Sequence, residues 1–399
     1  MILLKYIRLL FAVLLCSLFF ASCAECDIPE EEDNRTARST LLVYMMAENN
    51  LDNWSKKDLN EIFAGAKYVP GDCDLFAFVD NNSTPFILRY YSKNGVSACD
   101  TVIEYKEDFY SSDIVEMGSV LDDLLSKYPT EKLNLVLWSH GDGWMKFNKV
   151  KSRAIGYDNG ENSTSGLPSK ASIEIEDLAL LLEGLEIPVE TLMFDACFMQ
   201  CVEVAYELRN SCKYILASPA EIPANGAPYD NMIKEFFATD INPYGLMMSY
   251  ANGYSVSKGV VLSVIECAHI EQFAECVAAF VPQYFPYGKK IDTSNLFAYL
   301  KKHSSWPEFF DMNGVAKSFF TAEDYAEWKS SFNKMVVCSY AADNWETMYS
   351  SSYIAAVNKE QFGGVSMYLP MEDGRHYSLN NDFATLSWYG ATAWDVAGW

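Results

Sequence analysis

Positive charge is scarce in this 399-residue chain. It has 30 Lys and Arg residues against 54 Asp and Glu residues, a formal net charge of -24 at pH 7. Such a surface repels the phosphate backbone of nucleic acids. The composition therefore excludes nucleic acid as a partner and favours basic ones.

Several well-known catalytic motifs are also missing. The sequence has no G-x-S-x-G nucleophile elbow, no H-E-x-x-H metal motif and no phosphate-binding P-loop. Its only histidines are His140, His269, His303 and His376. A histidine-dependent site must draw on these four, and we interpret the last three as surface or satisfied core residues.

The 11 cysteines form no dense disulfide framework. An odd number remains after Cys16 and Cys23 are set aside with the N-terminal segment described next, so at least one thiol is unpaired. Most of the others read as small buried residues or as an occasional disulfide. Cys201 follows Cys197 by four residues on a predicted helix, but a two-cysteine metal site there lacks further ligands.

The N-terminal residues read as an export signal. Lys5 and Arg8 precede an uncharged apolar run that ends in Phe20-Ala21-Ser22-Cys23, which resembles a bacterial lipobox. We predict a signal peptide over 1–22, lipidation of Cys23 and an acidic flexible tether over 23–39. A soluble secreted protein or an uncleaved anchor are the alternatives. The prediction places the protein in the cell envelope, on the outer membrane or surface of a Gram-negative bacterium, with the lipid as its only membrane contact.

Short apolar strands alternate with amphipathic helices after residue 40. This pattern predicts an α/β fold with a mostly parallel sheet and helices on both faces. We expect one domain over 40–285, and a helical segment with a late strand over 286–399 packed on it. The predicted strands are 41–47, 73–80, 86–92, 133–138, 189–194, 213–218 and 259–266, and the predicted helices include 53–66, 172–185, 198–209, 230–237 and 243–254.

Two strand ends carry the most reactive side chains. His140 follows the apolar strand 133–138, and Cys197 follows the strand 189–194. Functional groups in open α/β sheets gather beyond the carboxyl ends of strands. If the two strands are neighbours, the imidazole and the thiol can meet. The alternative is a core histidine and a buried cysteine.

Further features fit acyl transfer at a thiol. An imidazole can deprotonate the thiol, and the start of the predicted helix 198–209 would favour a thiolate at Cys197. The backbone N–H groups of Gly141 and Cys197 are candidates for an oxyanion hole. Together these parts predict a Cys/His site for nucleophilic catalysis.

The residues around both positions resemble a known family. "WSHGDGW" and "FDACFMQCVE" are similar to the His-Gly and Asp-Ala-Cys signatures of the clostripain-type cysteine peptidases, which have a caspase-like fold. "YMMAENNLD" (44–52), "ASPAEIPANGAPYD" (217–230) and "GVSMYLP" (364–370) extend the likeness over most of the chain after residue 40. The resemblance implies His140 as base, Cys197 as nucleophile and the Gly141 backbone at the oxyanion.

The resemblance also implies specificity for basic side chains. In that family an acid at the position of Asp195 lines the pocket for Arg or Lys, although Asp195 could instead cap a helix. Asn225 stands where family members often have a second acid, and Ala227 where they often have Trp. The pocket is therefore expected to be wider and less acidic than is usual, and a different specificity stays open.

Three further expectations concern processing, ions and assembly. The polar segment 145–172 offers a cleavage site at Arg153-Ala154, unless it is simply an exposed loop. The sequence requires no cofactor and no metal, but the acidic turns 48–52 and 158–161 could hold calcium, which some family members use, although they lack EF-hand spacing. We expect a monomer.

The sequence thus predicts a cysteine endopeptidase that cleaves peptides and proteins after Arg or Lys. The alternative is a catalytically silent surface lipoprotein that binds basic peptides or glycans on the same fold. Intact His140, Cys197 and Asp195 favour the enzyme, since a binding protein has no need of all three.

Overall fold

The computed structural model describes residues 35–145, 154–160, 171–300, 309–347, 354–374 and 376–399. Residues Thr36 to Trp399 form one compact unit. The C-terminal segment thus belongs to the same unit as the predicted 40–285 domain. The predicted signal peptide, Cys23 and nearly all of the tether lie outside the described residues.

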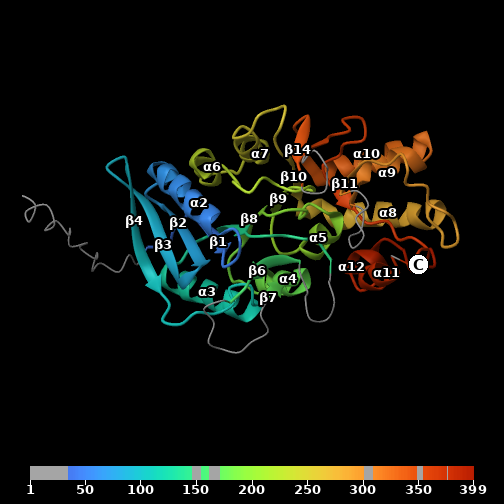
Figure 1. The fold of residues 1–399 in the computed structure, drawn as a ribbon. Coiled ribbons are helices and arrows are strands. Elements are labelled where there is room, and N and C mark those ends of the chain that lie inside the picture. Colours follow the sequence, from blue (N-terminus) through green and yellow to red (C-terminus); the bar gives the residue numbers. More distant parts are fainter. Residues whose placement is uncertain (1–34, 146–153, 161–170, 301–308, 348–353, 375) are drawn as a thin grey trace, which may run out of the picture. The chain divides into compact units, whose positions relative to one another are not determined.

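A mixed sheet forms the centre of this unit (Figure 1). Its five middle strands are parallel, and each edge adds two antiparallel strands. Among the described residues the strand order is β13 (Val336–Ala341), β10 (Val261–Glu266), β9 (Tyr214–Ala217), β8 (Val189–Asp195), β5 (Leu133–Trp138), β1 (Ser39–Met46), β2 (Cys73–Asn81), β3 (Ser83–Lys93) and β4 (Val96–Glu104).

The predicted fold class is confirmed, and the sheet has two edge strands that the sequence did not predict. All seven predicted strands of the 40–285 region are present, and the predicted strands 73–80 and 86–92 form the antiparallel pair β2–β3. Strand β4 was not predicted because its side chains are half-buried or exposed and show no apolar run. Strand β13 comes from the segment expected to be helical, so that segment completes the sheet instead of only packing on it.

Alternation of side chains along β1 divides the core into two layers. Leu41, Val43 and Met45 face α2 (Asp52–Gly65), α6 (Tyr229–Phe236) and α7 (Pro243–Ala251). Leu42, Tyr44 and Met46 belong to the opposite layer. That layer contains α3 (Ile114–Lys127), α4 (Ile175–Glu183), α5 (Val202–Glu207) and α8 (Ile270–Tyr284), so helices cover both faces as predicted.

Smaller elements surround the sheet. The late strand predicted within 286–399 is only the two-residue strand β16 (Ser366–Met367), which forms a small sheet with β12 (Phe309–Asp311) and β11 (Ala298–Leu300). The others are the β6 (Ile155–Asp158) and β7 (Ala171–Ile173) pair, the β14 (Asn344–Glu346) and β15 (Ile354–Ala356) pair, the helices α9 (Met312–Phe319), α10 (Ala322–Met335), α11 (Tyr377–Phe383) and α12 (Ser387–Ala391), and the short helices η1 (Ala66–Tyr68) and η2 (Cys267–His269).

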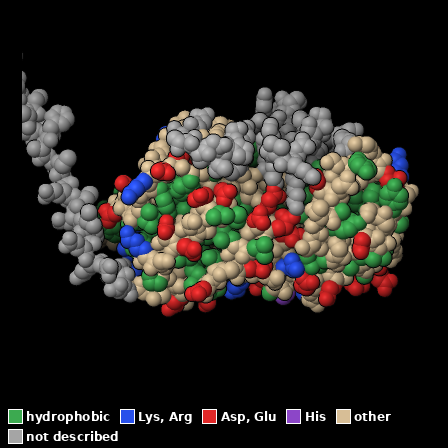
Figure 2. Space-filling view, turned by 90° about the horizontal axis from the view of Figure 1, so that it is seen from below, with side chains coloured by type: hydrophobic (Ala, Val, Ile, Leu, Met, Phe, Trp, Pro, Cys, Tyr) green, Lys and Arg blue, Asp and Glu red, His purple; other side chains and the backbone are tan. Residues whose placement is uncertain are grey.

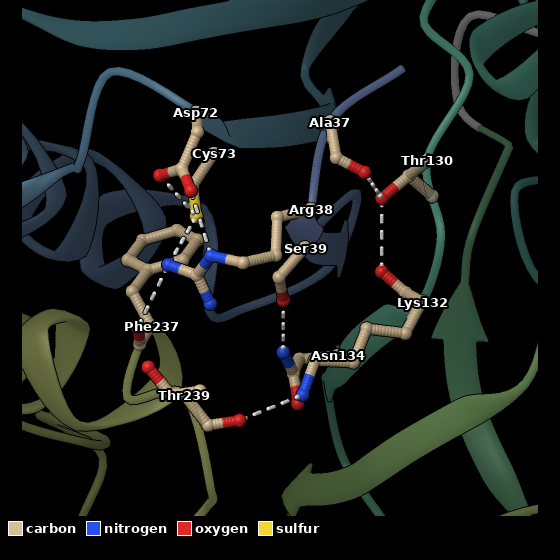
Figure 3. A network of polar contacts seen from close by, with 10 residues as sticks. All are labelled: Ala37, Arg38, Ser39, Asp72, Cys73, Thr130, Lys132, Asn134, Phe237 and Thr239. Atoms are coloured by element: carbon tan, nitrogen blue, oxygen red, sulfur yellow. Dashed lines mark hydrogen bonds and ion pairs between the residues drawn. The ribbon is translucent and has the colours of Figure 1, made fainter.

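The start of the compact unit is fixed by polar contacts (Figure 3). The guanidinium of Arg38 donates to Asp72 at 2.8 Å and to the carbonyl of Phe237 at 3.3 Å. The amide of Asn134 donates to the hydroxyl of Ser39 at 3.0 Å. Arg38 and Ser39, at the predicted end of the tether, therefore make defined contacts with the compact unit.

On the face that Figure 2 shows, acidic side chains are more frequent than basic ones. None of the helices in the described ranges is long and apolar enough to cross a bilayer.

All eight cysteines within the described ranges are free thiols. Cys212 and Cys267 come nearest to a pair, with their sulfurs 3.7 Å apart.

Candidate active site

The carboxyl ends of β5 and β8 bring His140 and Cys197 to one pocket. The two strands are parallel neighbours, with Trp138 opposite Asp195 in the register. The pocket has a volume of about 810 Å³, and His140, Gly141, Asp195 and Cys197 all line it. The placement expected from strand ends is therefore what the sheet produces.

His140 is held by the segments that flank it. Its carbonyl accepts a hydrogen bond from the N–H of Gly156 at 3.1 Å. Its ring nitrogen Nε2 lies 2.8 Å from Oδ1 of Asn50, and its ring meets that of Tyr157 edge-on. The residue is half-buried. The turn after β1 thus positions the imidazole, a role for Asn50 that the sequence did not reveal.

Gly141 lets the histidine loop and the cysteine loop touch. A Cβ atom at this position would lie 2.7 Å from the carbonyl oxygen of Cys197 and 2.9 Å from the sulfur of Met199. No side chain fits in that space. The bridge to β6 uses the carbonyl of His140 and the N–H of Asp142, which leaves the N–H of Gly141 outside the ladder.

The helix expected to begin at residue 198 starts later. Helix α5 begins at Val202, and the residues between it and β8 form a tight loop. Phe198 adopts a positive φ of 61°, so a right-handed helix cannot run through this residue. The predicted helix N-terminus at Cys197 is therefore wrong and gives its thiol no dipole.

The Cys197 thiol is protonated in this arrangement. Burial raises its pKa to about 12, and the nearby carboxylates of Glu221 and Asp142 act in the same direction. The N–H of Ile222, which lies 3.4 Å from the sulfur, opposes them. A base is required before this sulfur can act as a nucleophile.

Asp195 is buried at the wall of the pocket and is not a helix cap. Its Oδ2 accepts hydrogen bonds from the N–H of Ala227 and the hydroxyl of Tyr229, both at 2.9 Å. Its Oδ1 accepts one from Tyr250 at 2.8 Å. Burial raises the pKa of this carboxyl, while the three donors oppose that shift. The donors fix a carboxylate at the pocket wall, where it can meet a cation.

Sequence similarity now identifies the family. The sequence profile of the clostripain family matches residues 43–399. The chain belongs to the clostripain family.

Solved structures agree with this assignment. The fold superposes on a secreted C11 cysteine protease from Bacteroides thetaiotaomicron with a TM-score of 0.78 and 28% identity, covering 90% of this chain and 100% of that one. An inactive zymogen C11 protease from Parabacteroides distasonis gives a TM-score of 0.77 and 25% identity, covering 90% and 99%. Clostripain from Hathewaya histolytica is 25% identical over 228 residues, 50% of this chain but only 42% of that relative.

A second buried acid stands behind the pocket of this clostripain-family protein. Asp58 of α2 accepts a hydrogen bond from the indole N–H of Trp138 at 2.8 Å. A Cβ atom on Gly226 would lie 2.9 Å from both Asp58 and Asp195, so Gly226 separates two carboxylates by little more than its backbone. Burial raises the pKa of Asp58 to about 8, and the charge of Asp195 adds to the effect. The signal missed in the sequence is an acid one turn before Ile62 on the apolar face of its helix.

Asn225 does not line the pocket, although its neighbours Ala224 and Gly226 do. The other charged residues of the lining are mostly acidic. They are Asp142, Glu221, Glu346 and Lys258, of which the last two form an ion pair. The pocket as a whole is therefore negative, despite the asparagine at position 225.

Other candidates fall into three groups. Arg153 and His303 lie outside the described residues, while Ala154 is buried just before β6. Of the two tryptophans that flank His140 in the sequence, Trp138 lines the pocket and Trp144 packs against Tyr368 in the core. His376 is buried 2.6 Å from Asp373, as expected of a satisfied core residue.

The two acidic turns considered for calcium come together in the fold. Glu48 and Asp158 meet beside Asp80, and one carboxylate oxygen of each lies within 4.8 Å of the others. The sequence did not indicate Asp80, because it lies inside an apolar strand. The three oxygens are hard ligands of the kind that calcium prefers.

Proposed function

We propose that this protein is a cysteine endopeptidase that cleaves peptide bonds after Arg or Lys. The observation that carries the proposal is the shared pocket, in which His140, Cys197 and Asp195 all line one cavity. A thiol, an imidazole and a fixed carboxylate at one site match the needs of acyl transfer from a cationic substrate.

Substrate binding follows from the charges around the pocket. An Arg or Lys side chain would enter toward Asp195, whose position is fixed by Ala227, Tyr229 and Tyr250. Asp58 behind Gly226 would ionise as the cation arrives, because a nearby positive charge lowers the pKa of a carboxyl. Asp58 of α2 would thus take the place of the second acid that family members often have at the position of Asn225.

The chemistry then proceeds in two stages. His140 takes the proton of Cys197, and the sulfur attacks the substrate carbonyl carbon. The resulting oxyanion accepts hydrogen bonds from the N–H groups of Gly141 and Cys197. The amine product leaves with the proton from His140, and a water molecule, deprotonated by His140, hydrolyses the thioester and restores the thiol.

The resting arrangement requires activation by substrate. The ring of His140 contacts Asn50, and the thiol pKa of about 12 keeps Cys197 protonated. Closing the pocket with substrate brings the carbonyl to the sulfur and allows proton transfer in the transition state. Free thiolate is therefore not needed at neutral pH.

The test is hydrolysis of fluorogenic peptides that differ only in the residue before the reporter. We expect turnover after Arg and Lys, and loss of at least about 1,000-fold in kcat for Cys197→Ala. Turnover after other residues would retain the peptidase and overturn the basic pocket. Silence on every peptide, with reductant and calcium present, would leave the alternative of a surface protein that binds basic peptides or glycans.

We also propose that Cys23 carries a lipid and that the segment after Arg153 is cut. The proposals rest on the lipobox-like residues before Cys23 and on the basic residues of the 145–172 segment. Mass spectrometry of the envelope fraction would detect a diacylated Cys23 peptide and an N-terminus at Ala154. An unmodified Cys23 peptide, or an intact chain in active protein, would contradict the respective proposal.

A further inference from the structure

Two cysteine side chains meet at the end of the sheet that lies opposite the active site. The sulfurs of Cys212 and Cys267 lie 3.7 Å apart. Cys212 comes just before β9, and Cys267 comes directly after β10, which pairs antiparallel with β9. Because β9 runs parallel to β8, the start of β9 lies away from Cys197, which follows the carboxyl end of β8. Neither thiol takes part in the proposed reaction.

The backbone around the two cysteines is held by the sheet. The N–H of Cys267 donates to the carbonyl of Lys213 at 2.9 Å, and the N–H of Lys213 donates to the carbonyl of Val189 at 3.0 Å. Cys267 is buried, and Cys212 is half-buried and packs against the same hydrophobic core. A disulfide requires sulfurs about 2.05 Å apart. Rotation of the two side chains therefore has to close the remaining gap.

The donor set around this pair does not suit a metal. Structural zinc sites use four ligands, usually Cys and His. Within the described ranges, no third Cys, His, Asp or Glu places a ligand atom where it could share one ion with these two sulfurs. Two neighbouring thiols without further ligands can still be oxidised together, and the product is a disulfide.

We propose that Cys212 and Cys267 form a disulfide after export, by exchange with an oxidant that itself carries a disulfide. The thiolate of the more exposed Cys212 attacks the oxidant and displaces one thiol. The thiolate of Cys267 then attacks the sulfur of Cys212 and displaces the second thiol. The pair loses two protons and two electrons, and the oxidant is reduced to two thiols. Export, proposed above for the N-terminal segment, would bring the chain into a compartment where disulfides persist.

The surroundings of the pair set the rate and the effect of this reaction. The hydrogen bond with Cys267 and burial raise the pKa of Cys212. Because the thiolate is the attacking species, oxidation should become faster as the pH rises from about 7. The new bond would join positions 55 residues apart and so restrict the unfolded chain. Since it lies away from Cys197, it should stabilise the fold without changing turnover, a consequence that rests on the proposed function.

Mass spectrometry tests the disulfide without requiring peptidase activity. Reduced protein is freed of reductant, incubated with glutathione disulfide and then alkylated. A tryptic digest should contain the peptide 210–213, which carries Cys212, linked to the peptide 259–289, which carries Cys267. Cys276→Ser removes the other cysteine of the second peptide, so a link found in this variant must involve Cys267.

Thermal unfolding measures the effect of the link. Oxidation should raise the Tm of the wild type by roughly 5 °C, because the cross-link limits the freedom of the unfolded chain. Cys212→Ser should lose both the linked peptides and the increase in Tm. Cys276→Ser, which changes another half-buried cysteine, is the matched control and should keep both.

Two results would overturn the proposal. Either Cys212 and Cys267 are recovered only as alkylated or glutathione-capped residues, or oxidation stabilises Cys212→Ser as much as the wild type. Should Cys212→Ser fail to fold, Cys267→Ala takes its place with the same expectations. Protein alkylated in intact cells and purified from the envelope should already carry the link, and free thiols there would contradict its formation after export. A silent peptidase that forms the link rejects only the proposed function, and an active peptidase that never forms it rejects only the disulfide.

Discussion

At the residue scale, three donors on two helices and a loop fix the position of Asp195. Tyr229 belongs to α6 and Tyr250 to α7, and Ala227 precedes α6. A carboxylate held in this way does not reorganise when a cation binds, so its charge is fully available to the substrate. Specificity then depends on the charge of Asp195, and on that of Asp58 once it ionises, more than on the shape of the pocket.

Asp195→Asn should remove the preference for basic residues. We expect kcat/KM for Arg and Lys peptides to fall by about 100-fold or more, because a buried cation loses its partner, while peptides with neutral residues change little. Asp230→Asn, a half-buried acid outside the pocket, is the matched control. An equal loss on basic and neutral peptides would mean that Asp195 only supports the fold.

The raised pKa of Asp58 predicts how the free energy of unfolding depends on pH. Its folded pKa of about 8 exceeds the ordinary 3.8, so the protonated form is favoured by folding. The corresponding stability is fully present below pH 4 and is lost as the pH rises toward 8. Each pKa unit corresponds to about 1.4 kcal/mol. The free energy of unfolding should thus fall by a few kcal/mol over that range in the wild type.

Urea unfolding at several pH values measures this dependence. Asp58→Asn keeps a hydrogen-bond acceptor for Trp138 and removes the titrating group, so its stability should decline less between pH 4 and pH 8. Asp122→Asn, at an exposed position of α3, serves as the control. Parallel pH profiles for Asp58→Asn and the wild type would contradict the assignment of a raised pKa to Asp58.

At the element scale, the pattern of apolar residues predicts the strands correctly but does not predict the turns. The apolar runs of β1, β5 and β8 predict both the strands and their shared functional edge. The loop after β8 was misread as helix because its residues are apolar at helical spacing. Its path depends on the positive φ of Phe198 and on N–H bonds from Phe198 and Gln200 to residues of another loop, which no local pattern encodes.

The same limit explains what the sequence did not reveal in the site. Asn50, in the turn after β1, lies 90 residues before His140, and Asp58, on α2, lies 80 residues before Trp138. Tertiary packing alone brings each pair together. Their side chains are ordinary for a turn and for a helix. Only the juxtaposition of β1 with β5 gives them a role.

Asp311 ties several C-terminal elements together. It is fully buried at the N-cap of α9, where Oδ1 accepts from the N–H groups of Asn313 and Gly314. Its Oδ2 accepts from Tyr299 of β11 and from the N–H groups of Gly363 and Gly364. One carboxylate thus joins a helix, a strand and the loop before β16.

Asp311→Ala should therefore cost about 3–5 kcal/mol of unfolding free energy, since it leaves several buried donors without an acceptor. The matched control is Asp113→Ala at the N-cap of α3, whose bonds are exposed. It should cost about 1 kcal/mol. Denaturant titration compares the two, and equal losses would show that the buried network adds nothing to the cap.

At the scale of the whole molecule, the excess of acidic residues acts on encounter with substrate. A net charge of -24 attracts cationic peptides over distances that depend on ionic strength. Raising the salt from about 20 to about 500 mM should reduce kcat/KM several-fold for a substrate with extra Lys residues away from the cleaved bond. A substrate with a single basic residue should be less affected, and equal salt dependence would exclude steering.

The most direct test of the account is covalent labelling of the nucleophile. A peptide electrophile that ends in Lys should react with the protein, and mass spectrometry should place the adduct on Cys197 among all the cysteines. Asp195→Asn should slow that labelling, while a matching electrophile that ends in Leu should react slowly with both proteins. Labelling that spreads over other thiols, or that proceeds equally with Lys and Leu, would contradict a Cys197 peptidase with a basic pocket.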